Sequence, residues 1–341
     1  MSEYGLQGTS LSTITFPEMT DLVQRTFLQR QNMIERKALE IFIKEPIAKG
    51  NGNTKKFTEV DTSTYARLKV EGGDTKKASF GVGYSKVMTK KRVGLEISIS
   101  QEMRDENRYS EVGTLMLNLG DFCPNRIDLD ATHRLTFGSA TSYTDMDGET
   151  IDTTVGDGLA LFSTSHTLVF SSTTFSNRVS GDPVFSKQAL QAAETLFTTN
   201  IFSNFGEKRT LKPNVIISGD DPETVDNIAQ YLGSTSDATQ MNSGVMNVHK
   251  NKYRHIILRN LATTATGAPD STKRRWWMLA KVGAGYEGLQ AIYGEWEAPH
   301  MKPVTAAQED YSKDIWTYGT RAGYGFVIVS PKGIVGSLPT S

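Results

Sequence analysis

The sequence is poor in the features that mark secreted, membrane-bound or strongly nucleic-acid-binding proteins. Its single cysteine, Cys123, excludes an internal disulfide and a disulfide-stabilised secreted scaffold. No apolar run approaches the roughly 18 residues of a membrane helix, and the first residues lack the basic and apolar regions of a signal peptide. A net charge of −1 excludes bulk attraction to nucleic acid. We therefore expect a chain made in the cytoplasm, with no membrane partner.

The signals of catalysis and metal binding are also lacking. No G-x-S-x-G motif occurs, and the acidic segment 144–158 lacks the glutamate that closes a calcium-binding loop. The five histidines have no metal-ligand spacing, which predicts ordinary core or surface roles for His133, His166, His249, His255 and His300. We predict no catalytic residue, no metal and no cofactor.

What the chain has instead is a separation of charge. Residues 75–95 hold six basic side chains and no acid, whereas residues 144–158 hold five acids and no base. The two segments are complementary surfaces, within one chain or between two, or they are separately solvated faces. The basic residues are Lys76, Lys77, Lys86, Lys90, Lys91 and Arg92, and the acids are Asp145, Asp147, Glu149, Asp152 and Asp157.

The hydrophobic pattern changes its period at the end of the basic segment. Leu95, Ile97 and Ile99 alternate with polar residues, as in a strand with one buried face. Ser100 then stands where a helix N-cap is expected. The acids that follow suit the positive end of a helix, and they are Glu102, Asp105 and Glu106. A long basic β-arm that runs into such a helix is useful mainly in proteins that wrap around copies of themselves.

The first half of the chain predicts helices and a hairpin. Apolar residues between 20 and 44 share one helical face. Residues 53–100 predict a long hairpin whose first arm includes a strand at 66–70. A long helix over 101–138 follows, in which Pro124 either bends the helix or begins a second one.

The second half alternates strands and helices without the regular rhythm of a doubly wound sheet. Ser186 predicts the N-cap of one helix, and Asp221 with Pro222 predicts the start of another, which Gly233 ends in the left-handed conformation. Strands are predicted at 213–218, 253–261, 275–282 and 316–329. The predicted class is therefore α+β.

One motif suggests a nucleotide-binding enzyme. Gly283, Gly285 and Gly288 fit the pattern G-x-G-x-x-G, whose glycines open a helix that holds a pyrophosphate. Gly294 and Pro299 interrupt the helix that must follow. We interpret the run as a β-turn.

A second motif suggests a single-strand nucleic-acid binder. Trp276 and Trp277 follow Arg274 and Arg275, and aromatic rings beside cations stack on bases. Alternation along a strand would point one ring inward and the other outward, which suits an interdomain or intersubunit contact. We favour packing.

The order of these parts resembles that of the major capsid proteins of tailed bacteriophages, which have the Hong Kong 97-type fold. The run ISISQEMRD at 97–105 looks like the family's junction between extended loop and spine helix. The run DGLALFSTSH at 157–166 looks like the D-G-x-x-L-F-x-x-x-H run of Mu-like major head subunits. Residues 213–218 and 321–336 stand where that family has an axial-domain strand and a late peripheral-domain strand. Pro124 departs from the pattern, because it falls inside the expected spine helix.

The resemblance implies a structural α+β protein, not an enzyme, with five parts. These are an N-terminal arm at 1–50, an extended loop at 51–100, a peripheral domain with the spine helix at 101–185, an axial domain at 186–305 and a return to the peripheral domain at 306–341. An encapsulin-like shell around an enzyme cargo is the alternative with the same fold.

The resemblance also implies the partners. The chain is expected to form hexamers and pentamers of an icosahedral virion capsid, assembled in the host bacterial cytoplasm around double-stranded DNA that is enclosed without sequence-specific binding. Portal and scaffold or decoration proteins are further expected partners. The extended-loop residues expected to contact a neighbouring subunit are Lys76, Lys77, Lys86, Lys90, Lys91 and Arg92. Their candidate acidic partners are Glu102, Asp105, Glu106, Asp145, Asp147 and Asp152.

Overall fold

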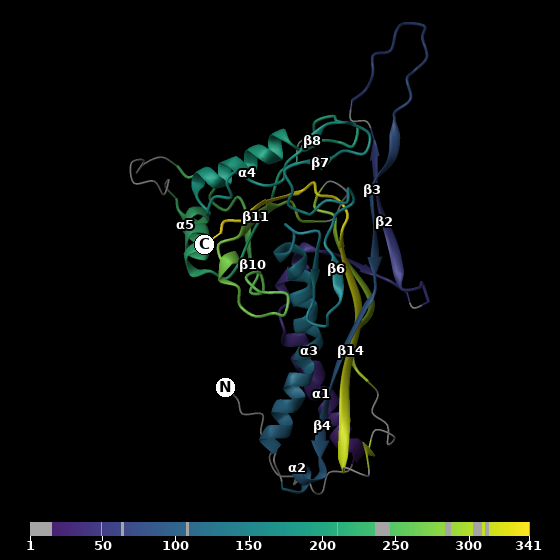
Figure 1. Ribbon diagram of the computed structural model, residues 1–341, viewed down its shortest axis with the longest axis vertical. Coiled ribbons are helices and arrows are strands. Elements are labelled where there is room, and N and C mark those ends of the chain that lie inside the picture. Colours follow the sequence, from purple (N-terminus) through teal and green to yellow (C-terminus); the bar gives the residue numbers. More distant parts are fainter. Residues whose placement is uncertain are drawn as a thin grey trace. The chain divides into compact units, whose positions relative to one another are not determined.

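The computed structural model describes residues 16–340 except 49, 63–64, 107–108, 210, 236–245, 284–287, 303–308 and 311–313. In this part of the chain, two compact units are each assembled from three segments (Figure 1). Unit 1 comprises Met1–Arg36, Lys90–Ile127 and Glu295–Tyr324, and unit 2 comprises Lys37–Thr89, Asp128–Gly294 and Gly325–Ser341. The presence of both helices and sheets confirms the predicted α+β class.

Unit 1 is built on the antiparallel pair of β4 (Lys91–Ser100) and β14 (Ile315–Ile328). The predicted alternation of β4 is confirmed at Ile99, which is buried between exposed or half-buried polar neighbours, whereas Leu95 is exposed. Helix α1 (Phe16–Met33) contributes Phe27 to the same core. The buried cluster consists of Phe27, Ile99, Val112, Met116, Leu119, Trp316 and Tyr318.

The predicted helices differ from the observed ones at their ends. The Ser100 hydroxyl caps helix α2 (Gln101–Asp105) by accepting the Met103 backbone N–H at 3.2 Å, as predicted. That helix is short, and the long helix is α3 (Tyr109–Thr136). Helix α1 ends at Met33, well before residue 44, and Lys37–Ile41 forms a separate 3₁₀ helix.

Helix α3 continues through Pro124, so the alternative in which a second helix begins at this proline is wrong. Proline removes one backbone N–H and crowds the preceding turn, so it usually kinks or ends a helix. Here Leu119 before it and Ile127 after it are both fully buried. Packing on both sides of the proline therefore overrides its local preference.

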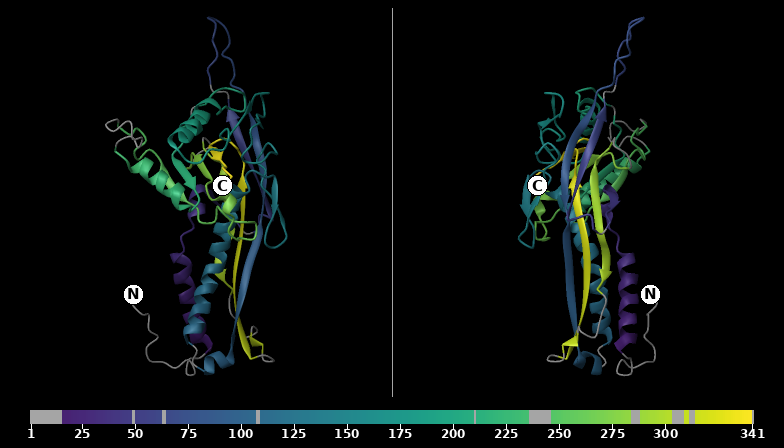
Figure 2. Two further views of the ribbon diagram at one scale, coloured as in Figure 1. Left: turned by 60° about the vertical axis from the view of Figure 1, so that its left-hand side comes forward. Right: turned by 90° about the vertical axis from the view of Figure 1, so that its right-hand side faces the viewer.

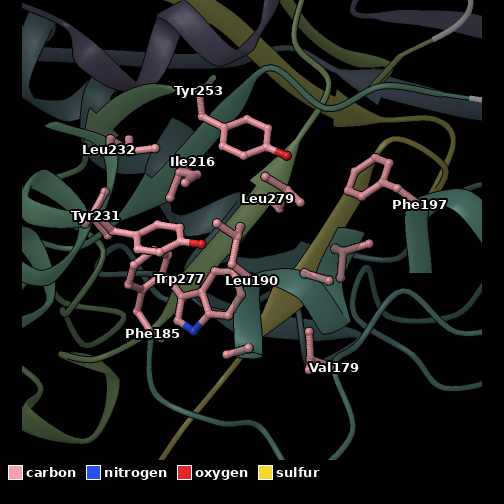
Figure 3. Close-up of a cluster of buried hydrophobic side chains, with 14 of the residues drawn as sticks. Val179, Phe185, Leu190, Phe197, Ile216, Tyr231, Leu232, Tyr253, Trp277 and Leu279 are labelled. Carbon is pink, nitrogen blue, oxygen red and sulfur yellow. The ribbon is translucent and has the colours of Figure 1, made fainter. Parts of the chain in front are cut away.

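Unit 2 contains a four-stranded sheet in the order β10–β9–β11–β15. These strands are β10 (Arg254–Ile257), β9 (Val215–Ser218), β11 (Trp277–Ala280) and β15 (Ile334–Ser337). Helices α4 (Lys187–Thr199) and α5 (Pro222–Gly233) bury apolar faces against it. Figure 3 shows the resulting core, in which Trp277 packs among side chains from both helices and the sheet. Its Nε1 donates to the Pro183 carbonyl at 3.0 Å.

Both predicted N-caps of unit 2 are confirmed. Ser186 accepts the Ala189 backbone N–H, and Asp221 accepts that of Thr224. The predicted stop at Gly233 is wrong in detail, because Gly233 is the last helical residue and Ser234 is the C-cap, in an extended conformation.

The predicted hairpin is shorter than residues 53–100. It consists of β2 (Thr54–Thr62) and β3 (Phe80–Thr89), joined by a segment that carries no strand at 66–70. Strand β4 does not return along β2 but pairs with β14. The sequence shows the period of a strand but not its partner, which explains the difference.

The remaining strands complete the fold. A five-stranded sheet has the order β1–β12–β14–β13, with β4 also on β14. The strands not yet described are β1 (Ile43–Pro46), β5 (Ser142–Thr144), β6 (Thr150–Asp152), β7 (His166–Thr167), β8 (Thr174–Phe175), β12 (Ala291–Met301) and β13 (Glu309–Asp310). Among the described residues, no helix combines the length and the apolar content that crossing a membrane requires.

Candidate intersubunit surface

A β-bulge gives the hairpin an exposed apolar face. The pairing of β2 with β3 reaches Thr58 opposite Ser85, shifts register, and resumes at Val60 opposite Val82. Opposed residues, and residues two apart, share a face, so Val60, Val82 and Phe80 lie together. Their exposed fractions are 59%, 58% and 79%. We call these three residues the hydrophobic hairpin face.

The opposite face of the hairpin is closed by its own unit. A Cβ added to Gly81 would lie 2.4 Å from the Phe170 ring, and one added to Gly83 would lie 2.3 Å from Asn204 Nδ2. At either distance, an added Cβ would force the neighbouring side chain to move, which favours glycine at both positions. The Phe170 backbone N–H donates to the Asn204 carbonyl at 3.0 Å, which holds these two contact residues together. The hairpin thus covers its own unit with one side and presents the hydrophobic hairpin face on the other.

A buried set of charges holds the base of the hairpin. Asp61 accepts hydrogen bonds of 2.6 Å from Arg209 Nη2 and from the Asn204 backbone N–H. Lys332 Nζ lies 2.9 Å from Asn204 Oδ1 and 3.4 Å from Glu59 Oε1. Buried charges are stable only when paired and hydrogen-bonded, and here two cations balance two anions. We call Glu59, Asp61, Asn204, Arg209 and Lys332 the hairpin-base cluster.

The tip of the hairpin extends beyond its strands. In Figures 1 and 2, residues 65–79 project away from the rest of unit 2. Tyr65, Leu68 and Val70 are exposed in this segment. A two-stranded hairpin is marginally stable alone, and exposed apolar surface of this extent marks an interaction site. The hairpin therefore carries apolar surface that a partner would bury.

One predicted loop cation meets an acid of its own chain. Lys86 Nζ lies 2.5 Å from Asp152 Oδ2 and also contacts the Thr154 hydroxyl. Burial alone would raise the pKa of Asp152. Hydrogen bonds from Lys86 and Thr154 outweigh this effect, so the pKa lies below its usual value. The basic and acidic segments are therefore complementary within one chain at this pair. Because Asp152 is exposed, the pair contributes about 0–1 kcal/mol.

The other predicted cations fall in two places. Lys76 and Lys77 are exposed at the hairpin tip. Lys91 and Arg92 begin β4 and Lys90 directly precedes it; Arg92 is exposed and the two lysines are half-buried. The single basic arm predicted from the sequence is thus divided between the hairpin and a strand of unit 1.

The predicted acids divide in a similar way. Five of the six are exposed, namely Glu102, Asp105, Glu106, Asp147 and Asp152. The sixth, Asp145, is buried, and its Oδ1 accepts the backbone N–H groups of Asp147 at 2.9 Å and Glu149 at 3.0 Å. This carboxylate holds a turn and is not presented to a neighbouring subunit.

The two ends of the 157–166 run form a buried hydrogen-bonded pair. His166 Nδ1 lies 2.7 Å from Asp157 Oδ2, and its Nε2 lies 3.1 Å from the Leu161 carbonyl and 3.2 Å from Asn177 Oδ1. Both ring nitrogens therefore lie within hydrogen-bond distance of oxygen atoms. Burial raises the pKa of Asp157, but hydrogen bonds from His166 and the Leu159 N–H lower it below its usual value. The pair is structural, because both side chains are buried.

The motifs that suggested other functions fare differently. Trp276 and Trp277 are both buried, so the prediction that one ring points outward is wrong, and stacking on bases is excluded. Trp276 precedes β11 and does not share its alternation. Residues 284–287 of the glycine run lie outside the described residues. Within the described part of the chain, no group of His, Cys, Asp and Glu is arranged to hold a metal ion.

Sequence reasoning missed the hairpin-base cluster and the hydrophobic hairpin face. A regular period of two would bury Val60 and expose Glu59 and Asp61, but the bulge and the tertiary packing reverse that assignment. One signal was present: Gly81 and Gly83 alternate along β3, and glycine inside a strand marks a close backbone approach.

Comparison with known proteins identifies the family of this chain. A family model described as phage capsid protein matches residues 83–337. The capsid structure of the cyanophage P-SCSP1u is similar at a TM-score of 0.51, with 11% identity over 87% of this chain and 85% of that chain. This likeness shows a shared fold.

Two further solved structures have lower scores. A chain of Mycobacterium phage Adephagia has 10% identity and a TM-score of 0.49, over 89% of this chain and 90% of that chain. The procapsid of bacteriophage JBD30 has 13% identity and a TM-score of 0.47, over 96% of this chain and 77% of that chain. No curated protein matches the chain.

Proposed function

Because the chain belongs to the phage capsid protein family, we propose that it is the major head subunit of a tailed phage and that its copies close an icosahedral shell around double-stranded DNA. The role of this family is structural. The observation that supports a shell subunit best is the hydrophobic hairpin face, which the chain leaves exposed on the side of the hairpin away from its own unit. A second subunit that covers it removes apolar surface from water.

The parts of the chain take the following roles in this proposal. The β2–β3 hairpin is the extended loop, and we end that loop at Thr89 because β4 belongs to unit 1. Helix α3 is the spine helix of the peripheral domain at 101–185, to which 306–341 returns, and 186–305 is the axial domain. The segment 1–50, proposed as the N-terminal arm, begins outside the described residues.

The proposed partners follow from the shell. Copies of the chain form hexamers and pentamers in the host bacterial cytoplasm, with portal and scaffold or decoration proteins beside them. The net charge of −1 suits a container that encloses DNA without gripping it. An encapsulin-like shell would have the same subunit contacts and would differ in holding a protein cargo.

Electron microscopy of the purified chain, with limited trypsin digestion beside it, tests the proposal. We expect closed shells, tubes, hexamers or pentamers. Arg67, Lys69, Lys76 and Lys77 in the exposed tip are expected to be cut in free subunits and protected in assemblies. A chain that stays monomeric with crowding agents and added salt would contradict the proposal, and particles that hold protein in place of DNA would favour the encapsulin alternative.

The exposed charges are proposed to guide assembly. Lys76 and Lys77 of one subunit would meet exposed acids of a neighbour, such as Glu102, Asp105 and Glu106. Each exposed pair contributes about 0–1 kcal/mol, but the contact repeats at every subunit of a shell. Opposite potentials also speed encounter, and salt screens them.

We expect the K76E/K77E variant to assemble more slowly than the wild type, by about tenfold at low salt and less at high salt. Light scattering against time measures the rate. Lys86→Gln is the matched control, because this lysine pairs within its own chain, and we expect it to assemble at the wild-type rate. Equal assembly rates for K76E/K77E and the wild type at every salt concentration would contradict the proposal that Lys76 and Lys77 guide assembly.

A further inference from the structure

Asn51 and Gly52 form the one Asn-Gly dipeptide of the sequence. They lie in the connection between β1 and β2, where residues 50–53 are all exposed. Gly50 and Gly52 have φ angles of +102° and +73°, in the left-handed region that glycine adopts without strain. A Cβ added to either glycine would meet no atom of the described structure within 4 Å. Neighbouring elements therefore do not crowd the two glycines of this turn.

The side chain of Asn51 is held less firmly than other asparagines of the chain. Asn214 Nδ2 and Asn247 Nδ2 donate to backbone carbonyls at 2.8 Å and 2.6 Å, which fixes both carboxamides. The hydrogen bond of Asn51 is made by its backbone N–H, which donates to the Ala48 carbonyl at 3.4 Å. Within the described part of the chain, no hydrogen bond restrains the Asn51 carboxamide. This carboxamide can therefore turn toward the backbone nitrogen of the next residue.

We propose that Asn51 is a site of spontaneous modification, at which its side chain closes onto the backbone nitrogen of Gly52 and the asparagine becomes aspartate or isoaspartate. The Gly52 nitrogen is the nucleophile, Asn51 Cγ is the electrophile, and ammonia is the leaving group. Both reacting atoms belong to neighbouring residues, so closing the succinimide ring avoids the entropic cost of a bimolecular reaction. Glycine suits this step because it has no Cβ beside the attacking nitrogen.

Water is the only other reactant. A solvent base takes the proton of the Gly52 nitrogen, which forms a bond to Asn51 Cγ. The bond from Cγ to Nδ2 breaks, and Nδ2 takes up a proton and leaves as ammonia. A water molecule then opens the ring. Addition at Cγ breaks the new bond and gives aspartate, whereas addition at the main-chain carbonyl carbon of Asn51 breaks the original peptide bond and gives isoaspartate.

The modification changes the entry to the hairpin. Either product adds a negative charge to a chain whose net charge is −1. The new carboxylate precedes Lys55 and Lys56 of β2, and Lys55 is already paired with Glu45 at 2.8 Å. Isoaspartate also carries the main chain through Cβ and Cγ, which lengthens the connection between β1 and β2 by a methylene group. This proposal does not depend on the capsid assignment.

Peptide mass spectrometry of the folded full chain, after incubation in mildly alkaline buffer, tests the proposal. Trypsin is expected to release residues 50–55, which contain both Asn51 and Asn53. We expect this peptide to gain about 1 Da, the difference between an amide NH2 and a hydroxyl group. Two products should separate by chromatography, and the isoaspartyl product should accept a methyl group from protein L-isoaspartyl methyltransferase. Fragment ions should place the gain on Asn51, because the β-branched Thr54 hinders the same reaction at Asn53.

A synthetic peptide of residues 50–55 and the variant Asn51→Gln are the controls. The folded chain is expected to react at a rate within about tenfold of the peptide, because the turn is exposed. Glutamine keeps an exposed amide but must close a larger ring, so N51Q is expected to fold normally and keep its mass. A folded chain that stays unchanged while the peptide converts would overturn the proposal, as would a gain of mass on Asn53 alone or an equal gain in N51Q.

Discussion

The variant V60D/F80D/V82D is expected to fold and to form no shells. These three side chains make the hydrophobic hairpin face, and all are more than half exposed in the single chain. Burying one Val or Phe side chain fully contributes about 1.5–3 kcal/mol. Replacing three of them with carboxylates removes that contribution and places charge in the contact. Electron microscopy and size-exclusion chromatography measure the loss of assembly.

Two controls make that result specific. The conservative variant V60I/F80L/V82I keeps the apolar surface and is expected to assemble. Val184→Asp adds a charge at another exposed apolar residue of unit 2, and we expect the chain to fold normally. Exposed substitutions usually change stability by about 0.5 kcal/mol or less, so all variants should melt within a few degrees of the wild type. Normal shells from the aspartate variant would show that this face is not a subunit contact.

Asp157→Ala is expected to destabilise unit 2 by about 1–3 kcal/mol. The substitution leaves the buried His166 ring without the carboxylate oxygen that lies 2.7 Å from its Nδ1. Urea denaturation monitored by circular dichroism measures the effect. Asp147→Ala is the matched control, because Asp147 is an exposed acid of the same segment, and we expect a change of about 0.5 kcal/mol or less. Similar losses in both variants would contradict the role of the buried pair.

The same pair predicts how stability depends on pH. The pKa of Asp157 is lower in the folded chain than its unfolded value of about 3.9. A depressed carboxyl pKa contributes stability that is present above the unfolded pKa and is lost as pH falls through the folded pKa. The wild type should therefore lose its stability advantage over Asp157→Ala in acid. An advantage that stays constant down to the acid transition would contradict this assignment.

The sequence by itself determined the local features of the fold. Ser100, Ser186 and Asp221 were identified as N-caps because a cap depends on a side chain and the backbone three residues later. The alternation of Ile97 and Ile99 predicts β4, because the two-residue period comes from the backbone of the strand itself and needs no distant residue. The family resemblance, carried by the order of such segments, was confirmed by the match over residues 83–337.

The tertiary structure alone decided which strands pair and which polar residues are buried. Strand β4 pairs with β14, and Asp145 holds a turn in spite of its place among solvated acids. Glu59 and Asp61 lie at the bulge in the β2–β3 pairing, where they are buried and where Lys332 and Arg209 from distant parts of the chain pair with them. Caps and periods are set by neighbours in sequence, whereas the partner of a strand and the counter-ion of a buried charge come from residues far away in the chain, and no local pattern contains them.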